Sequence, residues 1–386
     1  MRKYLIFNIA LFTQFLPEIF SYSNDFFLLI YFIYLFVTKK ILNKLIVSPL
    51  ILILFLVTIK IIFSHNFPLF KQFFSDYRPF LVFGILYYTT FEIDAIPYRN
   101  KIFYFLIIII LLSIPNLIGM ISQPYYSSIL KYYYRYVIGG FENSDNTNIA
   151  QISSLNGRFS SIFGQPATSG FFFFITTILS FRLLFFNLTN TKVQIFFLII
   201  ILALSIFNGL VTKSAFYQFG FLPLILIYLY LRFKFAKIIL LFFFIFLSIF
   251  SFFILISIFL EDFILFFEYL TSGRYSENGN IIPLMKTVKP VNFLLGFFYI
   301  DPNTKAAGDS SLWMKFLQGG LVYVFFYYYH LKKNLHRLYI IDTKFKLFFI
   351  SIFFTMFLGE IGFTVFSQPK ATFISFILIK MFIRNV

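Results

Sequence analysis

The chain of 386 residues contains no cysteine, one tryptophan and three histidines, and charged residues make up only 12% of it. Without cysteine, the protein has no disulfide bonds, thiol catalysis or thiolate metal sites. The absence of cysteine does not indicate whether the protein functions in an oxidising or a reducing compartment. The histidines are not spaced as metal ligands, which argues against a zinc site. We therefore expect neither a metal nor a cofactor.

Apolar side chains dominate what is present. Hydrophobic residues make up 60% of the chain, including 65 Phe and 26 Tyr. A soluble fold would have to expose much of this surface to water, whereas lipid tails solvate it. The composition therefore predicts an all-α polytopic integral membrane protein, with residues 1–386 forming a single transmembrane domain.

A spanning helix needs roughly 20 predominantly apolar residues. The apolar runs predict about twelve transmembrane helices, at residues 4–22, 24–38, 45–64, 77–91, 102–121, 166–187, 193–211, 213–231, 236–260, 311–329, 346–365 and 370–384. The first run follows Met1-Arg2-Lys3 as in a signal peptide, but no small-residue cleavage site follows it, so we expect a retained anchor.

Charge predicts the orientation of these spans. With both termini in the cytoplasm, most of the 32 Lys and Arg residues lie on the cytoplasmic side and most of the 15 acidic residues on the other. The net charge of +17 therefore reflects topology and does not indicate nucleic-acid binding. The most basic connection, residues 330–346, is expected to contact anionic headgroups. Lys60, inside a span, is either functional or reaches to the interface.

Two connections on the outer side are long, namely residues 122–165 and residues 261–310. Loops of this length are usually functional or disordered, and the tyrosines of the first loop argue against disorder. Residues 123–137 predict an amphipathic helix lying at the membrane interface. We therefore expect two ordered periplasmic loops that cap the membrane domain.

Three cations, Arg158, Lys213 and Arg274, are predicted at the outer membrane surface beside turns rich in Gly and Ser. Arginine offers a planar fork of donors for phosphate, and lysine offers a point charge. Each alone is equally consistent with an interface anchor, a helix end or a turn. Together they favour a shared anionic site, with neighbouring polar residues as supporting candidates: Gln165, Ser214 and Ser310.

Three local motifs occur in order along the chain: Arg-Phe-x-x-x-Phe-Gly-x-Pro at Arg158 to Pro166, Thr-x-Ser at Thr212 to Ser214, and Ser-Gly-Arg ending at Arg274, followed by Leu295-Gly296 and Gly308-Asp309-Ser310. With this layout, the whole chain resembles the O-antigen polymerase and ligase superfamily of bacterial surface polysaccharide assembly. The resemblance implies a fold like that of the GT-C membrane glycosyltransferases.

Departures from the family pattern bear on which activity is expected. Members often have arginine directly after Thr-x-Ser, where this chain has Ala215. Ligases typically carry a histidine in or just after the second large loop, whereas residues 261–310 contain none and Asp309 lies at the exit. The resemblance therefore favours a polymerase over a ligase.

The resemblance implies metal-independent glycosyl transfer at the periplasmic face of the bacterial inner membrane. Donor and acceptor would both be oligosaccharides linked to undecaprenyl diphosphate. Membrane lipids would surround the protein, and a separate chain-length regulator is compatible with this activity as a further partner. In that chemistry Arg158, Arg274 and Lys213 would bind the diphosphate, and the acceptor hydroxyl would need a general base. The candidates for this base are Asp309, Glu142 and Glu277. Asp309 is the first choice, although it suits a helix N-cap equally well.

Two other functions remain open from the sequence. An O-antigen ligase would transfer the polymer to lipid A core and differs in acceptor rather than in chemistry. A transporter or flippase for lipid-linked oligosaccharides would show paired repeats and buried charges. The chain shows no internal repeat, and we expect few charges inside spans beyond Lys60.

Overall fold

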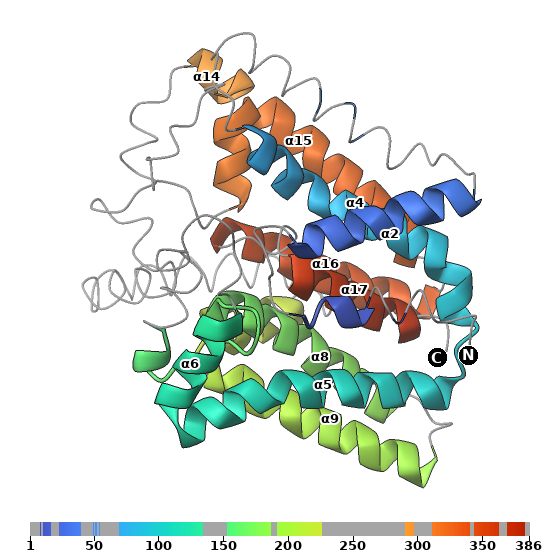
Figure 1. Cartoon of the computed structure of the whole chain (residues 1–386). Helices are drawn as coiled ribbons and strands as arrows, with labels where there is room; N and C mark the ends of the chain where they lie inside the picture. Colours follow the sequence, from blue (N-terminus) through green and yellow to red (C-terminus); the bar gives the residue numbers. More distant parts are fainter. Residues whose placement is uncertain are drawn as a thin grey trace, which may run out of the picture.

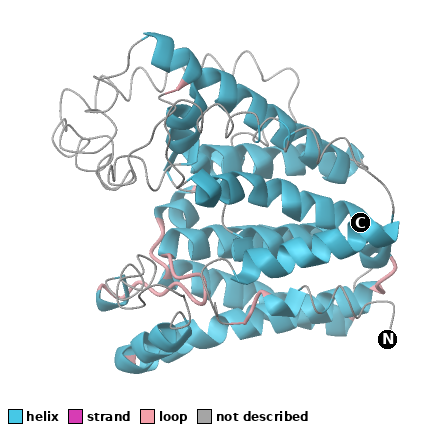
Figure 2. Cartoon of the chain, turned by 45° about the horizontal axis from the view of Figure 1, so that its top comes forward, coloured by secondary structure: helices cyan, strands magenta, loops and turns pink. Residues whose placement is uncertain are grey.

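The computed structural model describes residues 8, 11–16, 23–39, 49, 51, 54, 69–133, 153–186, 191–225, 290–296, 311–339, 343–362 and 369–382. Within these ranges the protein consists of helices and short connections and contains no strand (Figure 2). All of the predicted span 236–260, most of the predicted spans 4–22 and 45–64, and large parts of both long loops lie outside the described ranges.

The described helices follow the predicted spans, with several differences in length. They are α2 (Ser23–Lys39), α4 (Leu69–Asp94), α5 (Tyr98–Ile121), α6 (Gln123–Tyr133), α8 (Pro166–Phe186), α9 (Lys192–Val211), α10 (Ala215–Phe219), α14 (Pro290–Leu295), α15 (Ser311–Tyr339), α16 (Thr343–Gly362) and α17 (Pro369–Phe382). Among the described residues, α5, α8 and α9 are long and apolar enough to cross a membrane. The short α6 confirms the first part of the helix predicted from residue 123.

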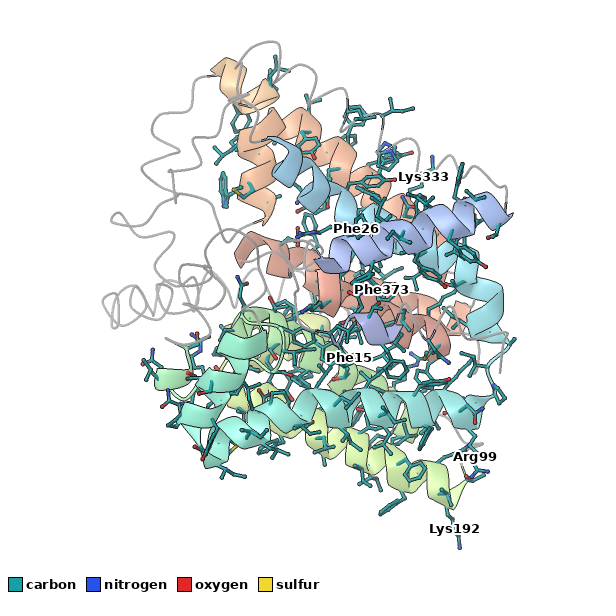
Figure 3. All side chains as sticks on the ribbon, viewed as in Figure 1. Phe15, Phe26, Arg99, Lys192, Lys333 and Phe373 are labelled. Atoms are coloured by element: carbon teal, nitrogen blue, oxygen red, sulfur yellow. The ribbon has the colours of Figure 1, made fainter. Side chains whose placement is uncertain are left out.

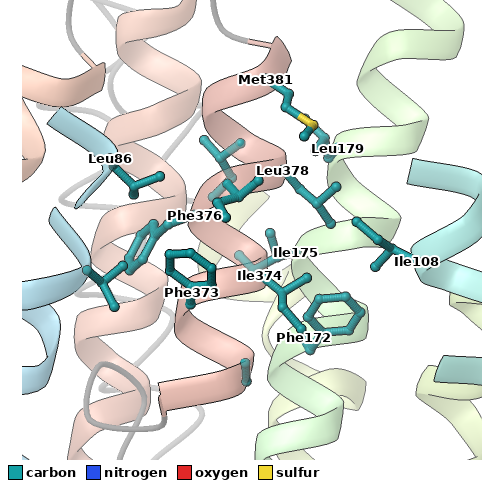
Figure 4. Packing of buried hydrophobic residues seen from close by; sticks show 14 of the residues in the cluster. Leu86, Ile108, Phe172, Ile175, Leu179, Phe373, Ile374, Phe376, Leu378 and Met381 are labelled. Carbon is teal, nitrogen blue, oxygen red and sulfur yellow. The ribbon is translucent and has the colours of Figure 1, made fainter. Parts of the chain in front are cut away.

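Helix α17 lies inside the bundle. All its described side chains, from Lys370 to Phe382, are buried. Figure 4 shows Ile374 and Leu378 directed toward Phe172 of α8 and Ile108 of α5, while Phe376 is directed toward α4. Because apolar residues occur on every side of the helix, it can be covered by protein all round.

The other helices pack on two sides of α17. Helices α5, α8 and α9 pack together on one side, and α2, α4, α15 and α16 pack on the other (Figure 1). Arg99, near the start of α5, and Lys192, at the start of α9, lie at the same end of the bundle (Figure 3), where Tyr98 packs against Phe382 at the end of α17. Helix α6 lies at the opposite end. Basic residues thus gather at the end that the charge pattern predicts to be cytoplasmic.

Helix α15 differs from the straight span predicted at residues 311–329. Its backbone is interrupted at Gly319 and Gly320, and Gly320 has a φ of 66°. The short helix α14 packs against this break, where an added Cβ on Gly320 would lie 2.2 Å from the carbonyl oxygen of Leu294. The break also lets Lys315 fold back, so that its ammonium lies 4.3 Å from the ring centre of Tyr327.

The structure adds two findings about charged residues. The basic connection at residues 330–346 is mostly helix, because α15 continues to Tyr339 and α16 begins at Thr343. Charged side chains also occur inside the helices: Lys315 and Glu360 are almost completely buried, and Tyr328 donates a hydrogen bond of 2.9 Å to Glu360. Protein neighbours, rather than lipid, surround these charges, which lowers the cost of burying them.

Candidate functional site

Two of the three sequence motifs meet in space at the end of the bundle where α6 lies. The backbone N–H of Phe159 donates to the carbonyl of Val211 at 3.3 Å, and Arg158 Nε donates to the carbonyl of Thr212 at 3.4 Å. In return, Lys213 Nζ donates to the carbonyl of Asn156 at 3.3 Å. The structure therefore brings Arg158 and Lys213 side by side, as the shared-site hypothesis requires.

The Thr-x-Ser motif forms the tight turn between α9 and α10. Thr212 is buried, and its Oγ1 donates to the carbonyl of Gly209 at 2.6 Å and accepts from the backbone N–H of Ser214 at 3.2 Å. Ser214 packs against Gly170 of α8, where an added Cβ would lie 2.4 Å from the Cβ of Ser214. The hydroxyl side chains thus shape the turn, and the lysine between them remains exposed.

Both contacting segments contain an unusual backbone conformation. Among the described residues, the non-glycine residues with positive φ are Ser161 (51°) and Lys213 (47°). A left-handed non-glycine residue typically costs on the order of 1–3 kcal/mol and persists only where its surroundings impose it. Such strain is common at functional sites, and here one such residue lies in each of the two contacting segments.

The segment that carries Arg158 is fastened to α6 as well as to α9. Tyr126 is fully buried, its ring lies edge-on to Phe159 at 5.2 Å between centroids, and its hydroxyl accepts from the backbone N–H of Ser160 at 2.9 Å. Burial raises the pKa of Tyr126 above its ordinary value, so the phenol stays protonated. Gly119 of α5 leaves room for Phe159, whose ring an added Cβ would approach to 2.5 Å.

The electrostatics of this region favour an anion. Arg158 is half-buried and Lys213 is exposed, so both side chains lie at the protein surface, where a ligand can reach them. Helix α8 begins at Pro166, directly after Gln165, and its amino-terminal end adds a partial positive charge near the same segment. Arg158, Lys213 and the start of α8 form what we call the cation site. A guanidinium group, an ammonium group and a helix amino terminus suit a phosphate or diphosphate group.

The structure describes four of the predicted site residues and leaves the others outside. Arg158, Lys213, Gln165 and Ser214 belong to the two contacting segments. The following lie outside the described residues, so they stay predictions: Arg274, Ser310, Asp309, Glu142 and Glu277. Within the described residues, no group of His, Cys, Asp or Glu side chains could hold a metal ion.

Sequence reasoning missed the buried polar residues behind the cation site. Asn116 of α5 and Asn208 of α9 are completely buried, and Asn116 accepts from the backbone N–H of Ser161 at 2.7 Å. A signal was available, since each asparagine interrupts a long apolar run, and such residues usually face the interior of a bundle. Sequence reasoning also missed Lys315 and Glu360 as buried charged residues, although both lie within predicted apolar spans.

Comparison with known proteins adds no further constraint on the function. No family model, curated protein or solved structure matches the chain.

Proposed function

We propose that this protein polymerises oligosaccharide repeat units carried on a polyprenyl diphosphate, at the periplasmic face of the bacterial inner membrane, as an O-antigen polymerase does. The observation that carries the proposal is the contact between the Arg158 segment and the Lys213 turn. Two motifs that the resemblance assigns to diphosphate binding thereby form one cation site. We also propose the twelve-span layout with both termini in the cytoplasm, supported by the position of Arg99 and Lys192 at the end of the bundle where α17 ends.

The proposed reaction transfers the growing chain from one lipid carrier to the repeat unit on another. A hydroxyl oxygen of the acceptor sugar forms a bond to the anomeric carbon of the donor, and the bond between that carbon and the phosphate oxygen breaks. The proton of the acceptor hydroxyl passes to a carboxylate, with Asp309 as first candidate and Glu142 and Glu277 as the others. The diphosphate leaves on its carrier with a gain of negative charge.

The cation site suits the stabilisation of that charge. The segments that carry Arg158 and Lys213 are joined by a backbone bond from Phe159 to Val211 before any ligand binds, so little reorganisation of the two segments is needed when charge develops on the leaving group. Arg274 of the second outer loop would complete the site from the other side. Because fixed cations supply the stabilisation, the proposed reaction needs no metal ion.

One observation favours a flippase for lipid-linked oligosaccharides as a second candidate. Helix α15 is broken at Gly319 and Gly320, and Lys315 and Glu360 are buried within the bundle. Broken helices and buried charges are typical of transporters. Polymerisation remains our first proposal, because the sequence shows no internal repeat of the kind that many transporters carry.

Deleting the gene should leave lipid A core carrying a single repeat unit if the protein is the polymerase. Loss of a ligase would leave core without any repeat while polymer accumulates on the carrier, and loss of a flippase would trap single units on the cytoplasmic leaflet. A gel ladder of the surface glycan, combined with analysis of the carrier lipid, separates the three results. Full-length polymer on core in the deleted strain would refute the proposal.

Replacing Lys213 with glycine should stabilise the protein and impair its activity. Glycine adopts a φ near 47° without strain, so we expect the free energy of unfolding in detergent to rise by about 0.5–1 kcal/mol. Polymerisation should fall because the ammonium is lost. The control Lys213→Ala loses the ammonium but keeps the strain, so its activity should fall without the gain in thermal stability. Wild-type activity in both variants would identify Lys213 as a turn residue only.

A further inference from the structure

Helices α5 and α9 are joined by a buried polar network next to the cation site. Asn116 Nδ2 donates to Asn208 Oδ1 at 2.8 Å, and Asn208 Nδ2 donates to Ser113 Oγ at 2.7 Å and to the carbonyl of Leu204 at 2.7 Å. Ser113 Oγ in turn donates to the carbonyl of Ile109 at 2.6 Å. Ser113, Asn116 and Asn208 are at most 2% exposed.

On one side, the network holds the segment that carries Arg158. The backbone N–H of Ser161 donates to Asn116 Oδ1 at 2.7 Å, and Ser161 Oγ donates to the carbonyl of Leu112 at 2.5 Å. These two bonds fasten the left-handed Ser161 to α5. Ser161 follows Arg158 by three residues, so the direction in which the chain leaves Arg158 depends on this attachment.

On the other side, the same network reaches the turn that carries Lys213. The carbonyl of Asn208 accepts from the backbone N–H of Thr212 at 3.2 Å, in the last turn of α9. This backbone bond is an ordinary helical one, so the Asn208 side chain acts by joining the last turn of α9, which leads into the Lys213 turn, to Asn116 of α5. A chain of hydrogen bonds runs from the Arg158 segment through Asn116 and Asn208 to the Lys213 turn.

Helix association alone does not require these amides. Apolar side chains of similar volume would also join α5 and α9, and hydrogen bonds between membrane helices stabilise only modestly. An amide buried in an apolar environment is costly unless all its groups are bonded, and here the donors and acceptors meet one another and Ser161. What the amides add is a specific attachment for non-helical backbone, which an apolar contact cannot provide.

We propose that Asn116 and Asn208 are positioning residues that hold Arg158 and Lys213 at the spacing a diphosphate needs. This inference rests on the proposed function, because it assumes that the cation site binds a diphosphate. It predicts that the two asparagines act on the ligand through the cations and do not touch it.

A double-mutant cycle on purified protein in detergent micelles tests the inference, with a polyprenyl diphosphate lacking sugar as the probe. Asn116→Ala should weaken binding of the probe roughly tenfold per folded protein, and Arg158→Ala should weaken it at least as much. If Asn116 acts through Arg158, adding Asn116→Ala to the Arg158→Ala protein should change the affinity little.

The matched control is Ser205→Ala. Ser205 is also buried on α9, one turn before Asn208, and its hydroxyl makes no hydrogen bond within the described part of the chain. This variant should bind the probe as the wild type does. If Asn116→Ala does not fold, Asn208→Ala leaves the acceptor of Ser161 in place and should show a smaller loss with the same non-additive pattern.

Two results would overturn the inference in distinguishable ways. If the wild type fails to bind the probe, the proposed function fails and the inference falls with it. If the wild type binds but the asparagine variants bind equally well per folded protein, or their losses simply add to that of Arg158→Ala, only the inference fails. In that case a fall in thermal stability alone would show that the network joins helices and does nothing more.

Discussion

Purified protein with Arg158 replaced by alanine is expected to polymerise lipid-linked repeat units about a hundredfold to a thousandfold more slowly than the wild type. That loss is typical for removing one preorganised donor that stabilises developing charge. The amount of folded protein should stay near normal, because Arg158 is half-buried and its bond to the carbonyl of Thr212 is long, at 3.4 Å. The rate is measured in vitro with defined repeat units on polyprenyl diphosphate.

Replacing Arg158 or Arg274 with lysine distinguishes a role in diphosphate binding from a role as a membrane anchor. Arg158→Lys and Arg274→Lys keep the charge but lose the planar fork, so activity should fall substantially if the arginines bind a diphosphate. An interface anchor needs only a long cationic side chain, which lysine supplies. Wild-type rates in both lysine variants would contradict the diphosphate role. Arg99→Ala is the control, because Arg99 is exposed at the opposite end of the bundle and should be dispensable for the rate.

Replacing Gly320 with alanine should cause the largest loss of stability among single substitutions in α15. The residue has a φ of 66°, and an added Cβ would lie 2.2 Å from the carbonyl oxygen of Leu294, which is backbone and cannot rotate away. Positive φ and overpacking each cost on the order of 1–3 kcal/mol, so we expect a combined loss of about 3 kcal/mol or more. The measurement is thermal unfolding in detergent.

The neighbouring Leu321 provides the control for this experiment. Its side chain is 41% exposed within the protein, so Leu321→Ala removes apolar surface without forcing backbone to move. Its unfolding temperature should stay close to that of the wild type. A Gly320→Ala protein as stable as Leu321→Ala would show that α15 does not need the break at which α14 packs.

Local patterns predicted the helices well where apolar runs were long. The predicted spans 102–121, 166–187 and 193–211 agree closely with α5 (Tyr98–Ile121), α8 and α9. The span at 77–91 was too short, because α4 continues through the more polar residues of its first two turns. The break in α15 could not be read from the sequence, since paired glycines such as Gly319 and Gly320 are also compatible with close helix packing.

The residues of the candidate site also divide into those that the sequence predicted and those that only the structure revealed. Arg158, Lys213, Gln165 and Ser214 could be proposed from motifs, because their residue types indicate phosphate binding and their positions follow from topology. The sequence favoured a shared site for Arg158 and Lys213, but the contacts that join their segments could not be deduced, because they link residues far apart in the chain. Asn116 and Asn208 each interrupt a long apolar run, which indicates a residue facing the interior of the bundle, but the sequence does not show that the two are partners.

By itself, the sequence determined that this protein is helical and which of its segments are apolar enough for a membrane. Helix formation and apolarity are local properties, set by a run of about 20 neighbouring residues, so they can be read directly. Only the tertiary structure decided that the Arg158 segment meets the Lys213 turn and that the pair Asn116 and Asn208, 92 positions apart, joins them. Such contacts depend on how helices pack and on which polar groups must satisfy one another away from water, and neither is encoded in any one segment.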